Sequence, residues 1–321
     1  MTATVVVPTR IGGPRLERLL DSLAGQTVIS RTIVVDNAAP PQVAELVARH
    51  DFAEHLRLEE NAGFGRAVNL AELQSEGTAL VLVNDDCVCE PRFVEALVAA
   101  LDPANGVVMA AGVLVESHDP GTVDTAGMEL DETLLVFDYL NGTPVASIGA
   151  ETSAPIGPCA AAAAFDRAAF ADAGGFDENL FAYWEDVDLV LRLRRAGGRC
   201  ALAAGARGRH EHSATLGAGS PEKNYLVGFG RGYVLRKWSV LESPRRIAQV
   251  LFEDGVICAG QLVLDRTPAG VRGRRDGYAA AGDLVRFPYP SEALRDHPPK
   301  PDTLVRRLRR RSRLREGRVG T

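Results

Sequence analysis

The chain has 321 residues, of which 46% are hydrophobic and 24% charged, the composition of an ordinary globular protein. This length can bury a large core, which predicts one large domain or a domain with an appendage. No run of about 18 apolar residues occurs, so no transmembrane helix is expected. The N-terminal stretch MTATVVVPTR lacks a basic region, and it predicts the first strand of the fold rather than a signal peptide.

The formal net charge of −6 is unevenly distributed along the chain. Residues 300–321 hold nine Lys or Arg against two acidic residues, a net charge of +7, which leaves −13 on residues 1–299. Such a tail is typical either of contact with an anionic surface or of a solvated, disordered terminus. The five cysteines are odd in number and form no CxxC pattern, as in reduced proteins, so we expect a cytoplasmic protein, at most peripheral at the inner face of the membrane.

Short β-branched runs alternate with helical patterns over the first part of the chain. Buried strands are expected at residues 4–8, 32–36, 79–85 and 107–115. Helices are expected at 14–25, 41–50, 91–101 and after Gly65, three of them with a proline near the start. This alternation predicts an α/β fold with a mostly parallel central sheet flanked by helices.

The later part of the chain is less regular. Residues 116–150 predict loops with a β-hairpin, and small apolar residues return at 155–176. A helix is expected after Asp188, ending at Gly197-Gly198. A helical region at 222–265 then gives way to Gly- and Pro-rich sequence that leads into the basic tail.

Polar residues stand at the carboxyl ends of three expected strands, where open α/β sheets bind their ligands. They are Pro8-Thr9-Arg10, Asp36-Asn37 and Asn84-Asp85-Asp86. Each residue alone also suits a turn or a helix cap, but their coincidence favours a site. Carboxylates beside the glycine-rich loop 61–69 predict a divalent cation that binds a diphosphate. That loop has Val68 at the third glycine position of a dinucleotide fingerprint, which disfavours a Rossmann dehydrogenase.

Two further groups of polar residues carry chemistry. His210 and His212 alternate on an expected strand, so at most one faces a given site, and their spacing from Cys87 and Cys89 fits no standard zinc pattern. The segment FAYWEDVD, residues 181–188, places three acids behind Tyr183 and Trp184. Capping of the following helix explains one acid. Carboxylates against an aromatic wall have a raised pKa, which suits a general base.

The ordered set of motifs resembles the family 2 glycosyltransferases of the GT-A fold, in particular the rhamnosyltransferase-like bacterial members. It covers residues 3–238 and comprises VVVPTR, VVDNAAP, NAGFGRAVNLA, LVNDD, VDTAGMELD, GGFDENLFAYWEDVDLVLRLRRAGGR and HEHSAT. The resemblance implies a GT-A domain at 1–238, with a nucleotide-binding half at 1–104 and an acceptor and catalytic half at 105–238. A helical and loop extension at 239–299 and a disordered tail at 300–321 would follow.

The resemblance also implies roles for single residues. Asp186 would be the catalytic base, and a divalent metal, Mn²⁺ or Mg²⁺, would lie on Asp86 and His210, the latter before the hydroxyl pair Ser213 and Thr215. Contacts to the nucleotide and donor are implied for Thr9, Asp36, Asn61, Gly63, Asn69, Asn84 and Asp85, and contacts to the acceptor for Trp184, Glu185 and Asp188. Two positions depart from the family: Asn84 replaces the first acid of a DxD motif, and Phe229-Gly230 replaces a frequent Arg-Asn pair, for which Arg231 is the candidate substitute.

The implied function is that of an inverting hexosyltransferase (EC 2.4 class) in cell-wall or polysaccharide biosynthesis. It would move a sugar from a nucleoside-diphosphate sugar, dTDP-rhamnose-like or UDP-hexose-like, to a hydroxyl of a glycan, lipid-linked or small-molecule acceptor. Two alternatives stay open. One is a catalytically impaired protein that binds nucleotide sugars, and the other is a module that contacts anionic membranes through the basic tail. Nucleic acid is disfavoured as a partner because the tail has no aromatic residues for base stacking.

Overall fold

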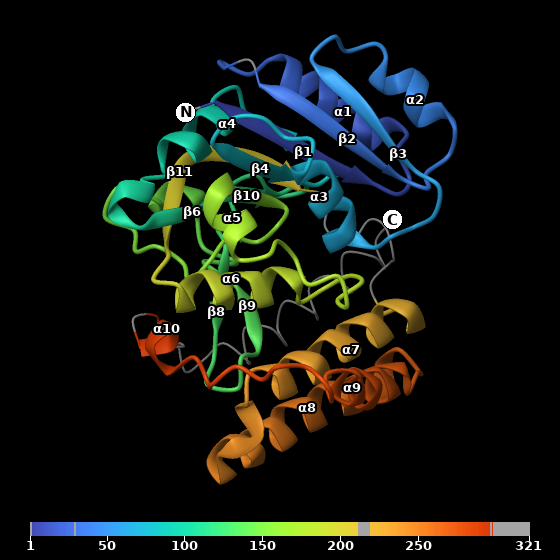
Figure 1. Ribbon diagram of the computed structural model, residues 1–321, viewed down its shortest axis with the longest axis vertical. Coiled ribbons are helices and arrows are strands. Elements are labelled where there is room, and N and C mark those ends of the chain that lie inside the picture. The colour runs from blue at the N-terminus through green and yellow to red at the C-terminus, as the bar shows by residue number, and fades with distance from the viewer. Residues whose placement is uncertain (1, 29, 211–218, 296, 298–321) are drawn as a thin grey trace.

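The computed structural model describes residues 2–28, 30–210, 219–295 and 297 (Figure 1). A nine-stranded sheet lies at its centre, with the strand order β3-β2-β1-β4-β10-β6-β11-β5 and β7 paired to β6. The strands of this sheet are β1 (Ala3–Thr9), β2 (Arg31–Asn37), β3 (Ala53–Leu58), β4 (Ala79–Val83), β5 (Cys87–Cys89), β6 (Val107–Glu116), β7 (Val123–Thr125), β10 (Ala162–Asp166) and β11 (Arg199–His210). A separate hairpin consists of β8 (Met128–Leu130) and β9 (Val136–Asp138).

The helices cover both faces of the sheet and form a further layer at one end of the molecule. They are α1 (Pro14–Ala24), α2 (Gln42–Val47), α3 (Phe64–Glu72), α4 (Phe93–Ala99), α5 (Arg167–Asp172), α6 (Glu185–Arg195), α7 (Pro221–Lys237), α8 (Pro244–Leu264), α9 (Ala269–Ala280) and α10 (Ser291–Arg295). In Figure 1, α7, α8 and α9 lie together below the β8–β9 hairpin, on the side away from β1 to β3.

The predicted α/β fold is confirmed, and its first half is parallel as expected. Strands β3, β2, β1 and β4 are parallel neighbours, and β6 and β11 form a second parallel pair. Strand β10 lies antiparallel between β4 and β6, and β5 and β7 are also antiparallel to their neighbours β11 and β6. The two parallel parts of the sheet are therefore joined through β10, which brings the carboxyl ends of β1, β2 and β4 close to residues from the second half of the chain.

The alternation of side chains along the strands produces two cores. Val5 and Val7 point to the core that α1, α2 and α4 cover, whereas Val6 points to the core that α3, α5, α6 and α7 cover. The leucines of α1 predicted at helical spacing (Leu16, Leu19, Leu20 and Leu23) are all buried in the first of these cores.

Three elements differ from the expectations. The edge strand β3 was not predicted because its sequence AEHLRL is largely charged and half-exposed. The helix α6 begins at Glu185 rather than after Asp188. The Gly-rich stretch 269–280, expected to be irregular, forms the helix α9 and packs closely on α7.

One helix among the described residues bears on the expectation that the chain has no transmembrane helix. Helix α8 has 21 residues, and an 18-residue stretch of it has a mean hydropathy of 1.5, which by length and composition alone is enough to cross a membrane. Only 22% of that stretch is buried in the structure.

Candidate active site

The structure brings the two predicted metal ligands together. Asp86 follows β4, and His210 ends β11, which pairs with β5 so that His210 lies beside Cys87. His210 Nε2 lies 3.3 Å from Asp86 Oδ1, and ligand atoms of Asp86, Cys87 and His210 lie within 4.8 Å of one another. Asp86 Oδ1 is buried and accepts no hydrogen bond of good geometry from the described residues. A buried carboxylate oxygen left in this state fits a cation.

A second carboxylate orients this histidine. Asp124, on β7, has Oδ2 at 2.8 Å from His210 Nδ1, which leaves Nε2 directed toward Asp86. Burial opposes a charge on His210, but its interactions with the carboxylates of Asp124 and Asp86 raise its pKa to about 9. The two carboxylates therefore favour a proton on His210, and a metal ion bound at Nε2 would replace that proton. The Cys87 thiol is an unsuitable anionic ligand because burial and the neighbouring carboxylates raise its pKa well above the usual value.

Thr9 and Asp85 join the ends of β1 and β4. Thr9 Oγ1 donates a hydrogen bond to Asp85 Oδ2 at 2.5 Å, and it accepts one from the Gly12 amide. Burial raises the pKa of Asp85 to about 6, with Asp86 adding to the shift while the Thr9 hydroxyl opposes it. These residues line the end of the sheet where the nucleotide was expected.

Asp36, at the end of β2, is already engaged by protein groups. Its Oδ2 lies 2.7 Å from Arg57 Nη1 and 2.9 Å from His55 Nε2, and its Oδ1 accepts from the Ala39 amide. Burial would raise the pKa of Asp36, but these hydrogen bonds together hold it below the usual value. Asp36 is therefore a fixed anion behind the site.

The loop before α3 is held in one conformation from two sides. The Asn37 side chain accepts from the Ala62 amide and donates to the Gly63 carbonyl, while Asn61 Oδ1 accepts from the Gly63 amide. Gly63 has φ of +83°, and a Cβ there would lie 2.4 Å from the Phe181 carbonyl oxygen. Only glycine suits this position, which brings the loop against the segment that precedes α6.

Asn69 lies in α3, and its side chain forms a clamp within the protein. It accepts from the Phe176 amide and donates to the Phe176 carbonyl, at 2.9 Å each. These contacts fix the chain around Gly175-Phe176 against α3. Asn69, for which a donor contact is expected, is therefore also engaged by groups of the protein itself.

The start of α6 has an unusual backbone. Tyr183 and Trp184 both have positive φ, 69° and 75°, although neither is glycine. Such residues are strained by about 1–2 kcal/mol each, and they are held because Trp184 Nε1 donates to the Val227 carbonyl and Phe64 N donates to the Phe181 carbonyl. This turn places Glu185 and Asp186 in the first turn of α6.

Both acids in that turn have raised pKa values, and Glu185 is the more deeply buried of the two. Burial raises the pKa of Asp186 to about 6, opposed by backbone amides that include the Val187 N–H. Burial and the neighbouring Asp186 raise the pKa of Glu185 well above its usual value. Two adjacent carboxyls shifted in this way form the kind of pair from which enzymes obtain a general base.

Asp186 and Asp124 act on a common neighbour. Burial and the carboxylates of Asp186, Asp138 and Asp124 together raise the pKa of the Cys159 thiol. Asp138 ends β9, so the β8–β9 hairpin contributes one of these carboxylates. Asp186 and the Asp124–His210 pair, which are far apart in sequence, are therefore close enough to share one electrostatic environment.

Two residues expected to contact the acceptor, Asp188 and Trp184, lie in the core. Asp188 has no exposed surface, and its oxygens contact Trp238, Lys237 and Arg192 at 2.8–3.0 Å. Trp184 is 4% exposed, with its ring packed on Gly230, where a Cβ would lie 2.4 Å from the Trp184 ring. The glycine at the position of the family's Asn therefore makes room for Trp184.

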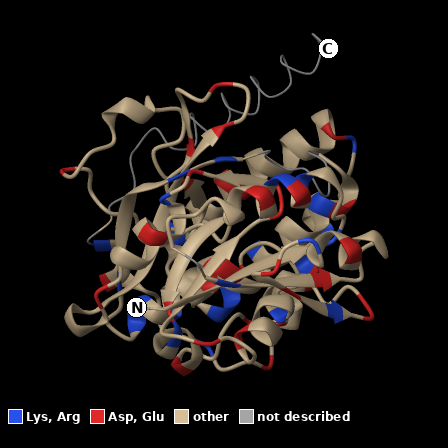
Figure 2. Cartoon of the chain, turned by 90° about the horizontal axis from the view of Figure 1, so that it is seen from above, with Lys and Arg blue, Asp and Glu red and all other residues tan. Residues whose placement is uncertain are grey.

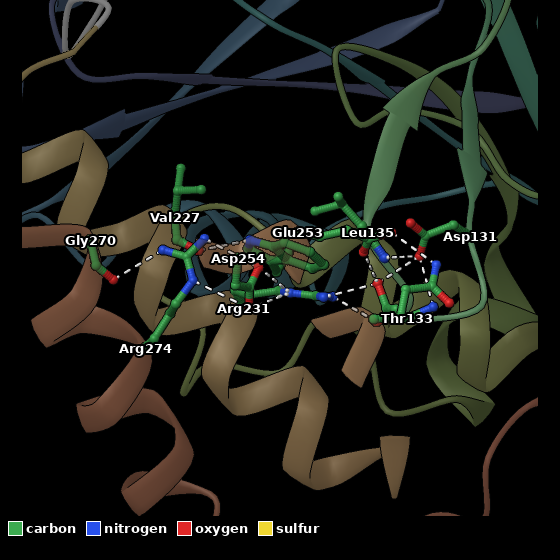
Figure 3. Close-up of polar contacts among 11 residues, drawn as sticks. Asp131, Thr133, Leu135, Val227, Arg231, Glu253, Asp254, Gly270 and Arg274 are labelled. Atoms are coloured by element: carbon green, nitrogen blue, oxygen red, sulfur yellow. Dashed lines mark hydrogen bonds and ion pairs between the residues drawn. The ribbon is translucent and has the colours of Figure 1, made fainter. Parts of the chain in front are cut away.

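Arg231, the suggested substitute for the missing donor contact, faces away from the site. It is fully buried and pairs with Asp254 at 3.2 Å and with the Thr133 carbonyl at 2.6 Å (Figure 3). Its position joins α7 to α8 and to the β8–β9 connection, so its role in this structure is in packing.

Sequence reasoning missed Asp124 and Asp138 as site residues, whereas Asn37 is among the polar residues that it places at the strand ends. Asp124 and Asp138 lie in or near the motif VDTAGMELD, but nothing in the spacing shows that β7 pairs with β6 and so reaches His210. His212, Ser213 and Thr215 lie outside the described residues, as does the tail.

Solved structures show which known fold this chain has. The crystal structure of GalNAc-T7 with UDP, GalNAc and Mn²⁺ superposes with a TM-score of 0.62 at 13% identity, over 92% of this chain and 56% of the other. The mannosyltransferase PcManGT of Pyrobaculum calidifontis, in complex with GDP-Man and Mn²⁺, gives 0.52 at 18% identity, over 92% and 78%. The fold is that of the GT-A glycosyltransferases.

Sequence comparisons find relatives of this chain among the glycosyltransferases. Residues 4–145 match the model of glycosyl transferase family 2. Two curated relatives from Mycobacterium tuberculosis are similar: a pre-mycofactocin glycosyltransferase, 28% identical over 83% of this chain, and an N-acetylglucosaminyl-diphospho-decaprenol L-rhamnosyltransferase, 29% identical over 66% of it. The predicted resemblance to family 2 and its rhamnosyltransferase-like members is thereby confirmed. The chain spans 53% of the length of the first relative and 77% of the second.

Proposed function

We propose that the protein is an inverting glycosyltransferase that moves a sugar from a nucleoside-diphosphate sugar to a hydroxyl group of its acceptor. The observation that carries this proposal is the His210–Asp86–Asp124 group, with Asp186 close enough to act on the same Cys159 thiol as Asp124. Asp186 suits a base, and the His210–Asp86–Asp124 group suits a cation that binds a diphosphate. We assign the nucleotide to residues 1–104 and the acceptor to residues 105–238.

The residues present fit a divalent cation, Mn²⁺ or Mg²⁺. Asp86 and His210 would hold it, and Asp124 would orient His210, an arrangement common around metal-bound histidines. A cation bound there would neutralise charge on the departing diphosphate. The protonated Cys87 favours a hard cation with oxygen and nitrogen ligands over zinc.

The chain's own residues would prepare the acceptor. Asp186, when ionised, takes the proton of an acceptor hydroxyl as that oxygen forms its bond to the anomeric carbon. The bond from that carbon to the diphosphate oxygen breaks on the opposite face, so the configuration inverts. Glu185 beside it stays protonated, which limits the repulsion that Asp186 would otherwise meet on ionisation. Tyr183, which is only partly buried, is a better candidate than Trp184 for contact with the acceptor.

The relatives support a choice of substrates for the first trials. One is named as an L-rhamnosyltransferase that acts on N-acetylglucosaminyl-diphospho-decaprenol, and the solved neighbours hold UDP or GDP-Man. We therefore propose dTDP-rhamnose-like or UDP-hexose-like donors and a glycan, lipid-linked or small-molecule acceptor. A role in cell-wall or polysaccharide biosynthesis would follow from these substrates.

Calorimetric titration of UDP, dTDP and GDP tests the donor site directly, with Mn²⁺, with Mg²⁺ and with EDTA. We expect one nucleotide to bind with metal and to lose most of its affinity in EDTA. Asp124→Asn should weaken the metal's own binding about 10–100-fold, because it no longer fixes the orientation of His210. The exposed Asp172→Asn on α5 is the matched control and should change neither.

The proposal is contradicted if folded protein binds none of the three nucleotides with either metal. In that case the departures at Asn84 and Gly230 have disabled the donor site. A protein that binds the nucleotide normally but transfers no sugar to any acceptor would instead be the impaired nucleotide-sugar-binding protein of the alternative hypothesis.

A further inference from the structure

The exposed apolar residues of the described chain gather around α8 and α9. Fifteen large hydrophobic residues are exposed, and ten of them lie between residues 247 and 285. Leu251, Phe252 and Val263 on α8 are 70%, 65% and 74% exposed. The ten are Ile247, Leu251, Phe252, Leu262, Val263, Leu264, Val271, Tyr278, Leu284 and Val285, and we call them the α8 face. A concentration of this kind marks a surface that something else covers.

Helix α8 has its polar side turned inward, the reverse of an ordinary surface helix. Its buried residues include Glu253, Asp254 and Gln261. Asp254 pairs with Arg231 of α7 at 3.2 Å, and Glu253 lies 2.8 Å from Thr133 Oγ1 (Figure 3). Gln261 donates to Asn224 Oδ1 at 3.0 Å. With its polar groups bound to the protein, the helix leaves its apolar groups outside.

The charges around the α8 face are those of a surface for anionic lipid. Both acids within α8 are buried, so its outer side carries no exposed acid. Exposed arginines stand at its ends and on the neighbouring segment: Arg245, Arg266, Arg272, Arg275 and Arg286. Arg245 and Arg275 each contact a carboxylate, yet their side chains stay 80% and 77% exposed. The exposed acids close by, Glu242 and Asp283, are fewer.

This pattern disfavours a second copy of the chain as the covering partner. Arginines stand at both ends of α8, so two copies paired along this helix would bring arginine to arginine in either direction. A bilayer with anionic headgroups accepts both features, because apolar side chains enter the acyl boundary while arginines meet phosphate.

We propose that the α8 face is a membrane-binding surface that lies in the interface of an anionic bilayer. The helix lies on the bilayer rather than across it, because Glu253 and Asp254 hold its other side to the protein through Arg231. This surface consists of described, folded residues and is separate from the basic tail at 300–321. It depends neither on the donor site nor on the proposed transfer reaction.

Vesicle co-sedimentation of the full chain tests this proposal without any sugar donor. The probes are vesicles of phosphatidylcholine alone and of phosphatidylcholine with phosphatidylglycerol. We expect binding to the mixed vesicles, and a loss of affinity of about tenfold or more in Leu251→Ser/Val263→Ser, since both side chains would enter the acyl boundary. Leu73→Ser/Val88→Ser is the matched control, with the same exchanges at exposed sites on α3 and β5, and should bind like the wild type.

Three results would overturn the proposal. The first is equal vesicle binding by the α8 variant and the wild type. The second is binding that Arg309→Gln/Arg310→Gln/Arg311→Gln abolishes while the α8 variant leaves it intact, which would move the contact to the tail. The third is a dimer, seen by light scattering, that the α8 variant converts to a monomer, which would make a second copy the partner.

Discussion

Glu185 and Asp186 share the first turn of α6, where burial raises the pKa of both carboxyls but does so further for Glu185. At neutral pH this difference leaves Asp186 as the ionised member of the pair. Its carboxylate also accepts the Val187 amide at the helix N-terminus, where a negative charge is favoured. A base that must be ionised to act, with a pKa of about 6, makes activity depend on pH in a defined direction.

We expect sugar transfer to decline as the pH falls below about 6, because protonated Asp186 no longer accepts the acceptor's proton. Asp186→Asn should lower the transfer rate about 10²–10⁴-fold while the nucleotide affinity stays unchanged. The measurement is the rate of nucleotide release against pH for both proteins, with the affinity taken from titration.

Asp172→Asn is the control here too, since that carboxylate is exposed on α5. If Asp186→Asn transferred sugar at the wild-type rate, another carboxyl would have to be the base. Asp138 is the first candidate, because it acts on the same Cys159 thiol as Asp186.

Part of this site was predictable from the sequence, because the order of its motifs resembles that of the family 2 glycosyltransferases. That resemblance implies Asp86 and His210 as a pair, and His210 Nε2 lies 3.3 Å from Asp86 Oδ1. What could not be read is which acid stands behind His210, since Asp124 reaches it only through the pairing of β7 with β6. The inward position of Asp188 likewise depends on Lys237 and Trp238, which come from another helix.

The packing of α7 on α9 depends on glycines in both helices. A Cβ at Gly232 would lie 2.0 Å from the Arg274 carbonyl oxygen, and one at Gly273 would lie 2.1 Å from the Tyr225 carbonyl oxygen. The two backbones are therefore in direct contact, which explains why a sequence with poor helix propensity forms a helix at 269–280. Tertiary packing here outweighs the local cost of the glycines.

Gly273→Ala should destabilise the protein by about 1–3 kcal/mol despite the better helix propensity of alanine, because the added methyl group has no room. Gly255→Ala on the outer side of α8 is the matched control. A Cβ there meets nothing within 4 Å, so alanine should stabilise by about 1 kcal/mol or less. Chemical denaturation of both variants measures the free energies of unfolding. Equal effects of the same sign would show that α7 and α9 are not packed backbone to backbone.

The elements that sequence patterns missed share one property, which is that their neighbours decide their structure. Strand β3 is a charged edge strand that pairs only with β2, and α9 requires α7. The apolar character of α8 was visible in the sequence, but hydrophobic pattern normally predicts the buried side of a helix. In α8 the buried side is instead the one that carries Glu253 and Asp254, because Arg231 and Thr133 face it.

At the scale of the whole molecule, acidic and basic residues lie interspersed over the described chain (Figure 2). One group of charges has a role in joining separate parts of the structure. Thr133, after β8, lies between Glu253 of α8, Arg231 of α7 and Asp131, with all contacts at 2.7–3.0 Å. The Thr133 hydroxyl has one proton to donate, so a protonated Glu253 completes the hydrogen bonds of the group.

Burial and the neighbouring Asp131 raise the pKa of Glu253 above its usual 4.5. The folded state therefore keeps a proton that the unfolded chain loses above about pH 4.5, and the stability contributed by Glu253 falls as the pH rises past that point. Glu253→Gln keeps the hydrogen-bond donor and removes the titration. Its melting temperature, relative to the wild type, should rise as the pH increases above about 4.5. Parallel melting curves across this range would show that Glu253 is ionised in the folded protein.

The antiparallel strand β10 has a consequence for how such enzymes are recombined. It belongs to the second half of the chain, yet it supplies the hydrogen-bonding partner of β4, the strand that leads to Asp85 and Asp86. A chimera that exchanges residues 1–104 for those of a relative must therefore form a new β4–β10 seam, with Leu82 opposite Ala163 and Leu80 opposite Phe165. Donor preference can therefore be transferred to this chain only if the strand that replaces β4 packs against the side chains of β10, Ala163 and Phe165 among them.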